Sequence, residues 1–233
     1  MHKLILWDFD GTLGYRKGNW EAAIFELTDD KIKKNEETLK MVSNMLQSGF
    51  PWHEPQKSFV SIINGTDWWE FVKPRFVAIF RELGYGMEVA IAKAAQIPEQ
   101  YGKFDKWKLY EDSIPCLQKV SRQNWKNVLV TNNIPEFPEI LKNLKIESFF
   151  EAVYVSSLTG FNKPNPLILN GYLETLPKNA KVIVVGDRVE SDLVFAKEIH
   201  AEGILVHSTV KDQSLSFNNL AELTGYLLSS NFN

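Results

Sequence analysis

Two patterns of hydrophobic and polar residues alternate along the chain. Short apolar runs that stop at polar residues are typical of buried parallel strands, and they occur at the start of the chain and throughout its C-terminal half. We expect strands at residues 4–7, 126–131, 152–156, 181–187 and 203–206. The stretches between the later runs are helical in pattern, as in βαβ units around a parallel sheet. We expect these helices at residues 115–122, 136–144, 166–176 and 192–200.

The segment after the first strand has a different pattern. Apolar residues recur there at helical spacing, which predicts no strand and helices at residues 20–27, 34–47, 66–84 and 86–95. Pro74 should interrupt or restart the third helix, because proline cannot donate a backbone hydrogen bond. We therefore expect an α/β fold with a Rossmann-like parallel-sheet core made of residues 1–14 and 110–233. An α-helical cap domain, residues 15–109, is inserted between the two parts of the core.

Composition and charge narrow the class of protein. A formal net charge of -3 over 233 residues gives no broad basic surface, which argues against a nucleic-acid polymer or an anionic membrane as partner. No apolar stretch reaches the ~18 residues that a membrane-spanning helix needs. Cys116 is the only cysteine, so no internal disulfide or cysteine-rich zinc site is expected. Without a secretory signal we expect a cytoplasmic protein, and no pattern indicates its oligomeric state.

Polar side chains follow the predicted strands where each of them ends. Asp8 and Asp10 follow the first strand, and on an extended chain both carboxylates point to the same side. Their mutual repulsion is tolerable beside a cation. The later strands are followed by a hydroxyl, a cation and a carboxylate, from Thr131, Lys163 and Asp187. Because the carboxyl ends of parallel strands share one edge of a sheet, we expect these groups to meet in one crevice.

These residues stand in four motifs that resemble those of the haloacid dehalogenase-like (HAD) superfamily. The motifs are D-F-D-G-T-L at 8–13, the threonine of V-L-V-T-N-N at 131, the lysine of F-N-K-P-N-P at 163 and G-D-R-V-E-S-D at 186–192. The resemblance extends over nearly the whole chain. It implies that Asp8 is a nucleophile and Asp10 the acid/base. It also implies a Mg²⁺ ion held by Asp8, the main-chain carbonyl of Asp10 and Asp187.

The remaining motif residues suit a phosphate ester. A carboxylate attacks an anionic ester only when positive charge offsets their repulsion, which Mg²⁺ and Lys163 would supply. The Thr131 hydroxyl and the main-chain amides of Asn132 and Asn133 can contact a phosphoryl oxygen. We expect substrate binding by Thr131, Asn132 and Lys163, and catalysis by Asp8, Asp10, Thr131 and Lys163. Asp192 either orients the metal ligands or Lys163, or only starts a helix.

The carboxylate of Asp10 distinguishes phosphate from halide chemistry. Dehalogenases of the resembled family lack a carboxylate at this position and need no metal, because a halide leaves without a proton. We expect a magnesium-dependent phosphatase that hydrolyses a small phosphorylated metabolite through an aspartyl-phosphate. Two alternatives stay open: a phosphomutase, which returns the phosphoryl group to a sugar, and a binding or regulatory protein that kept the fold without turnover.

The cap allows two interpretations. An aromatic pocket with a cationic rim would use Trp52, His53, Trp68, Trp69, Lys73 and Arg75. Tryptophans at helical spacing are more often core residues, and that interpretation is favoured. Arg16 and Lys17, in the loop that leads into the cap, are candidates for contacting substrate as the cap closes. His53, His200 and His207 lack metal-ligand spacing and are expected to be structural.

Overall fold

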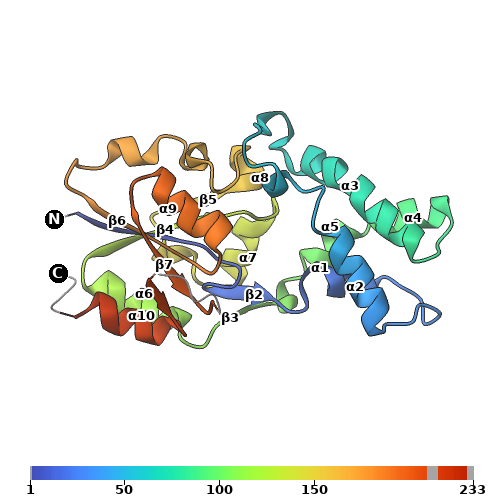
Figure 1. Ribbon diagram of the computed structural model, residues 1–233, viewed down its shortest axis with the longest axis horizontal. Coiled ribbons are helices and arrows are strands. Elements are labelled where there is room, and N and C mark those ends of the chain that lie inside the picture. The colour runs from blue at the N-terminus through green and yellow to red at the C-terminus, as the bar shows by residue number, and fades with distance from the viewer. Residues whose placement is uncertain (1, 209–214, 230–233) are drawn as a thin grey trace.

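The central feature of the structure, a computed structural model that describes residues 2–208 and 215–229, is one parallel sheet (Figure 1). Six strands lie in the order β5-β4-β1-β6-β7-β8. They are β1 (Lys3–Trp7), β4 (Trp125–Thr131), β5 (Ala152–Val155), β6 (Lys181–Gly186), β7 (Glu202–Val206) and β8 (Leu215–Phe217). The predicted α/β fold with a parallel sheet is confirmed. The predicted core domain also includes residues 1, 209–214 and 230–233, which lie outside the described residues.

β1 lies in the middle of the sheet, where its apolar run is buried on both faces. Leu6 pairs with Val128 of β4 on one side and with Val184 of β6 on the other. Successive side chains of a strand point to opposite faces, so Ile5 enters the larger of two apolar clusters and Leu4 the smaller. A strand with no polar face has no stable place at a solvated edge, which explains its central position.

Helices cover both faces of the sheet (Figure 1). The larger cluster is closed by α6 (Ser113–Arg122), α7 (Phe137–Asn143) and α10 (Leu220–Leu227). The smaller cluster is closed by α9 (Val194–Glu198) and the 3₁₀ turns η5 (Pro166–Leu169) and η6 (Tyr172–Thr175). The connections contain η4 (Glu147–Phe149), α8 (Ser156–Thr159) and a π-helix, η7 (Val189–Leu193).

Two parts of the core differ from the sequence predictions. The single helix predicted at 166–176 is wrong, because Asn170 and Gly171 take left-handed backbone conformations, with φ of 47° and 78°, and separate η5 from η6. The strand predicted at residues 203–206 is β7, and it is not the last element of the core, because β8 and α10 follow it. The other predicted strands and helices of the core are confirmed to within two residues at each end.

A helical insertion, residues 17–106, lies to one side of the sheet (Figure 1). Its elements are α1 (Asn19–Glu26), α2 (Glu36–Met45), η1 (Pro51–His53), η2 (Val60–Ile62), α3 (Gly65–Glu82), α4 (Met87–Ala94), α5 (Ile97–Tyr101) and η3 (Phe104–Lys106). Pro74 lies inside α3 without ending it, contrary to the prediction, because Val72 and Phe76 on either side are buried in one apolar cluster. None of the helices in the described parts of the chain is long and apolar enough to cross a membrane.

Two short strands connect the insertion to the sheet. β2 (Gly14–Arg16) and β3 (Trp107–Leu109) pair antiparallel and form a separate ribbon. The prediction that residues 15–109 contain no strand is therefore wrong. Arg16 stands opposite Trp107, so the chain enters and leaves the insertion at the same place.

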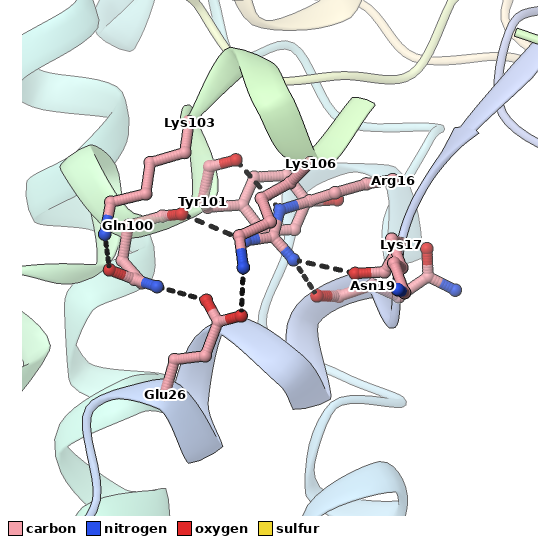
Figure 2. A network of polar contacts seen from close by, with 8 residues as sticks. All are labelled: Arg16, Lys17, Asn19, Glu26, Gln100, Tyr101, Lys103 and Lys106. Carbon is pink, nitrogen blue, oxygen red and sulfur yellow. Dashed lines mark hydrogen bonds and ion pairs between the residues drawn. The ribbon is translucent and has the colours of Figure 1, made fainter. Parts of the chain in front are cut away.

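Arg16 fastens this ribbon to the insertion (Figure 2). Its side chain is 1% exposed and donates from Nε to the carbonyl of Tyr101 and from Nη2 to that of Gln100, both at 2.9 Å. Nη1 donates to the carbonyl of Asn19 at 2.7 Å and more weakly to that of Lys17 at 3.4 Å. Burial lowers the pKa of Arg16, because desolvation disfavours the charged guanidinium more than Tyr101, Glu26 and Asp105 favour it. In this structure the guanidinium of Arg16 is engaged by main-chain carbonyls, and its contact with substrate during closure of the cap stays a prediction.

Candidate active site

The carboxyl edge of the sheet brings several predicted residues into contact. Asp8 is the first residue after β1, and its N–H donates to the carbonyl of Val185 in β6 at 2.8 Å, so the sheet ladder sets its position. Lys163 Nζ lies 2.7 Å from Asp8 Oδ1 and 2.6 Å from Asp192 Oδ1. All three side chains are buried, Asp192 completely. The three residues form one buried ion-pair group.

The main chain of Lys163 is held by Asn132 in the loop after β4. Asn132 Nδ2 donates to the Lys163 carbonyl at 3.0 Å, and the Lys163 N–H donates to Asn132 Oδ1 at 2.8 Å. These two hydrogen bonds fix the loop after β5 against the loop after β4. The side chain of Asn132 therefore positions the lysine, and its contact with substrate stays a prediction.

Asp10 lies next to this group and is held by the side chain of Asn133, a residue for which the sequence predicted a main-chain contact alone. Asn133 Nδ2 donates to Asp10 Oδ2 at 2.6 Å, and Asn133 Oδ1 accepts from the N–H of Ile134 at 2.9 Å. The available signal was the doubled asparagine of the T-N-N stretch, where the first side chain holds the lysine and the second holds Asp10.

A group of carboxylates suited to a divalent cation lies beside Lys163. Oxygen atoms of Asp8, Asp187 and Asp192 lie within 4.8 Å of one another. Asp187 Oδ1 is buried and has no hydrogen-bond partner in the described part of the chain. Gly11, with φ of 79°, permits this arrangement, because a Cβ atom there would lie 2.2 Å from Asp187 Oδ2. Carboxylate oxygens are the ligands that Mg²⁺ prefers, so these residues fit the predicted ion.

Burial and mutual repulsion raise the pKa values of the acidic side chains in the site. Burial and the charge of Asp192 raise the pKa of Asp8 to about 6 against the opposing charge of Lys163. Burial and the neighbouring acids also raise the pKa of Asp187 to about 7 and that of Asp10 to about 8. Burial alone would lower the pKa of Lys163, but the carboxylates of Asp192 and Asp8 raise it above its ordinary value. One buried cation thus faces several carboxylates, and the site favours further positive charge.

Thr131 is placed at the same edge as the last residue of β4. It pairs with Val155 of β5 in the sheet and is 1% exposed. Its Oγ1 has no hydrogen-bond partner among the residues that the structure describes. Buried hydroxyls in folded proteins nearly always have a partner, so this oxygen is available to a bound ligand.

The helical insertion contacts the loop that carries Lys163. The Phe59 N–H donates to the Gly160 carbonyl at 2.7 Å, and Asn165 Nδ2 donates to the Pro55 carbonyl at 3.1 Å. Gly160 allows the close approach, because a Cβ atom there would lie 2.6 Å from a backbone nitrogen of the insertion. The insertion therefore lies directly against the edge of the sheet that holds the site.

α3 reaches the loop after β4 through Trp69. The indole Nε1 donates at 2.8 Å to Oε1 of Glu136, the residue before α7. Burial raises the pKa of Glu136 in spite of this hydrogen bond. Trp69 and its neighbour Trp68 belong to the main apolar cluster and are 8% and 1% exposed. The core interpretation of the aromatic stripe is confirmed for these two residues.

The predicted cationic rim of the insertion is occupied by local contacts. Lys73 Nζ lies 2.9 Å from Glu70 Oε1, and Arg75 Nη2 donates to Ser48 Oγ at 2.7 Å. His53 Nδ1 accepts from a main-chain N–H at 3.3 Å and caps its own turn. These side chains stabilise the insertion itself.

The sequence model of the haloacid dehalogenase-like hydrolases matches residues 2–200, and the chain belongs to this family. The resemblance carried by the four motifs is thereby confirmed.

Two curated proteins are similar to part of the chain. A glyceraldehyde 3-phosphate phosphatase of Methanopyrus kandleri is 30% identical over 121 residues, which cover 51% of this chain and 52% of that protein. The HAD-hydrolase YfnB of Bacillus subtilis is 26% identical over 129 residues, 53% of this chain and 52% of YfnB. The matches span about half the length of these relatives.

Solved structures show the same fold over nearly the whole chain. The magnesium-bound structure of YfnB has a TM-score of 0.74 at 20% identity and covers 98% of this chain and 99% of that one. A β-phosphoglucomutase-like protein of Thermotoga maritima has a TM-score of 0.68 at 17% identity, with coverage of 97% and 98%. At these identities the similarity concerns the fold alone.

Proposed function

We propose that the protein is a magnesium-dependent phosphatase that hydrolyses a small phosphorylated metabolite through an aspartyl-phosphate on Asp8. The main support is the arrangement around Asp8, where buried Lys163 contacts the proposed nucleophile and a second carboxylate, Asp10, follows two residues later. An alkoxide leaving group needs a proton and a halide does not, so Asp10 is useful in phosphate chemistry. The phosphatase from Methanopyrus kandleri supports the same class of reaction.

The proposed Mg²⁺ ion would be held by Asp8, Asp187 and the main-chain carbonyl of Asp10. When bound, it offsets the negative charge of the carboxylates and of the phosphoryl oxygens. Asp192 accepts from Lys163 through one oxygen and from the Arg188 N–H through the other, at 3.1 Å. We assign Asp192 the task of orienting Lys163.

In the first proposed step, an Asp8 carboxylate oxygen bonds to phosphorus while the bond from phosphorus to the ester oxygen breaks. Asp10 gives its proton to that oxygen, so the leaving group departs as an alcohol. Lys163 and the Thr131 hydroxyl contact the phosphoryl oxygens and offset the charge that develops there. The raised pKa of Asp10 is consistent with a protonated side chain at the start of this step.

In the second step, water attacks the phosphorus of the aspartyl-phosphate and the bond to Asp8 breaks. Asp10 takes the proton of that water and returns to its protonated form. Inorganic phosphate leaves, and the Asp8 carboxylate is restored. Water must reach the site only after the alcohol has left, which is a reason for covering it.

We further propose that residues 15–109 act as the cap domain that covers this site and selects the substrate. The paired linkers β2 and β3 support these boundaries, because they join the insertion to the core at one place. The contacts of the insertion with the loops after β4 and β5 support the covering role. The size of the substrate of the Methanopyrus kandleri relative favours a metabolite of a few carbon atoms.

The test is a panel of sugar phosphates, nucleotides and short phosphorylated acids, assayed for inorganic phosphate with Mg²⁺ present. The wild-type protein should release phosphate, and Asp8→Asn should not, because the amide removes both the nucleophile and a metal ligand. Residual activity within about tenfold of wild type, a loss below ~1.4 kcal/mol, would contradict the mechanism. Isomerisation without phosphate release would identify a phosphomutase, and no turnover of any ester would favour a binding protein.

A further inference from the structure

Asn133 is 3% exposed and contacts the proposed acid/base directly. Its amide orientation is determined by the backbone, because the Ile134 N–H can only donate and must therefore face Oδ1. The amino group consequently faces Asp10 Oδ2, at 2.6 Å. If the amide were reversed, its amino group would face the Ile134 N–H, which is another donor. Its oxygen would then face Asp10 Oδ2, which is another acceptor.

An amide amino group restricts the oxygen that it contacts. It has no lone pair to offer, so Asp10 Oδ2 always accepts in this hydrogen bond. A carbonyl oxygen is a better acceptor than a hydroxyl oxygen, so a protonated Asp10 keeps Oδ2 as the carbonyl and carries its proton on Oδ1. We propose that Asn133 positions Asp10 for proton transfer by holding Oδ2 and leaving Oδ1 to serve the reaction.

This role rests on the proposed phosphatase function and assigns an atom to each transfer. In the first step the proton moves from Asp10 Oδ1 to the ester oxygen as the phosphorus–oxygen bond breaks. In the second step the same Oδ1 takes a proton from the attacking water. Both transfers need Oδ1 to point at the substrate, because proton transfer depends on alignment as well as on acidity.

Both ends of the contact are anchored by apolar packing. Phe9 stands between the two acids of the first motif and meets Phe137 edge to face, with ring centroids 4.8 Å apart. Phe137 is the first residue of α7, directly after the loop that contains Asn133. Phe9, Ile134 and Phe137 are fully buried. The packing of Phe9 against Phe137 thus holds the segment that carries Asp10 against the segment that carries Asn133, and so sets the distance between these two residues.

If Asn133 had a structural role alone, it would act only through the hydrogen bond that it accepts from the Ile134 N–H. The variant Asn133→Asp separates this structural role from the positioning of Asp10. The aspartate has nearly the same shape and keeps an oxygen for the Ile134 N–H, but it loses the donor toward Asp10. Asn133→Ala removes both hydrogen bonds. Asn127→Ala is a matched control, because Asn127 lies in β4, the strand that leads to Asn133, and is also 3% exposed. It uses its amide to bond Trp7 and Ser121, each at 2.9 Å.

The measurement is kcat/KM for two phosphate esters, the best alkyl phosphate of the panel and p-nitrophenyl phosphate. The nitrophenolate leaves readily as an anion, whereas an alkoxide needs the proton of Asp10. For Asn133→Asp and Asn133→Ala we expect a loss of about 100-fold on the alkyl ester and below about tenfold on the aryl ester. Asn127→Ala should change both values by the same factor.

Equal losses on the two esters would overturn the positioning role, because an unfolded fraction or an added negative charge slows both reactions alike. Full activity of Asn133→Ala on the alkyl ester would also overturn it, because that variant has no side chain that could hold Asp10 Oδ2. A wild-type protein that hydrolyses neither ester would reject the proposed function together with this role. An active wild type with uniform losses in the variants rejects the positioning role alone.

Discussion

Two buried cations, Lys163 at the edge of the sheet and Arg16 at the base of the insertion, are enclosed in different ways. Lys163 contacts two carboxylates, and their charge raises its pKa. Arg16 donates to main-chain carbonyls and lies over the Tyr101 ring, 4.7 Å from its centroid, and burial lowers its pKa. A cation among carboxylates belongs to a site that handles charge, whereas one among carbonyls holds segments of chain together. Burial and charge alone do not distinguish the two, but the partners do.

The largest effect that this comparison predicts follows metal removal. Lys163 is one cation against the carboxylates of Asp8, Asp187 and Asp192, so the site is short of positive charge. Treatment with EDTA should abolish phosphate release, and added Mg²⁺ should restore it. Full turnover of the chelated protein would show that Lys163 balances the site by itself. Unfolding should be followed in parallel, because a bound ion also stabilises the fold.

Replacement of Lys163 should lower turnover next most strongly. Lys163→Met keeps the length of the side chain and removes the charge, so we expect kcat to fall by about 100-fold to 1,000-fold. Steady-state kinetics at saturating substrate would measure this. The fully buried Asp192 would lose its cationic partner and keep the Arg188 N–H, so the variant should also be less stable. Unchanged kcat would place Lys163 with Arg16 as a purely structural cation.

Replacement of Arg16 should act on stability instead. Arg16→Met takes the guanidinium donors from the carbonyls of Gln100 and Asn19 and leaves the Tyr101 carbonyl the longer hydrogen bond from the Trp107 indole, at 3.3 Å. We expect a loss of about 2–4 kcal/mol in the free energy of unfolding. Urea titration would measure the loss, with exposed Lys17→Met as the control, expected to change by less than about 0.5 kcal/mol. The folded Arg16→Met protein should keep kcat within a few-fold. A large loss of kcat at unchanged stability would contradict the structural role.

The smallest expected effect concerns the contact between the insertion and the core. Trp69→Phe removes the hydrogen bond to Glu136 and keeps most of the packing, so we expect KM to rise about threefold to tenfold, equivalent to ~1 kcal/mol. Trp68→Phe is the control, because Trp68 Nε1 has no hydrogen-bond partner among the described residues. Equal values of KM for the two variants would show that the hydrogen bond does not contribute to covering the site.

The sheet and much of the site were predictable because each signal is local. An apolar run marks each of the strands β1, β4, β5, β6 and β7. Asp8, Asp10, Thr131 and Asp187 lie within three residues of where these runs stop, and Lys163 lies in the connection that follows β5. The pairing of β2 with β3 has no such signal, since Arg16 meets Trp107 only after the whole insertion has folded back. The role of the Asn133 side chain was missed for the same reason, because Asp10 lies far away in the sequence.

The central position of β1 has a consequence for synthesis on the ribosome. The strand is made before both of its partners: Leu6 pairs with Val128 and Val184, so its apolar residues stay unpaired in the sheet until those parts of the chain emerge. At about 5–20 residues per second, the first partner strand follows after roughly 6–25 s. The insertion is complete before then and can bury its own aromatic residues. The newly made chain therefore carries an unpaired hydrophobic strand ahead of a folded helical unit, which makes this interval the one most exposed to aggregation and chaperone binding.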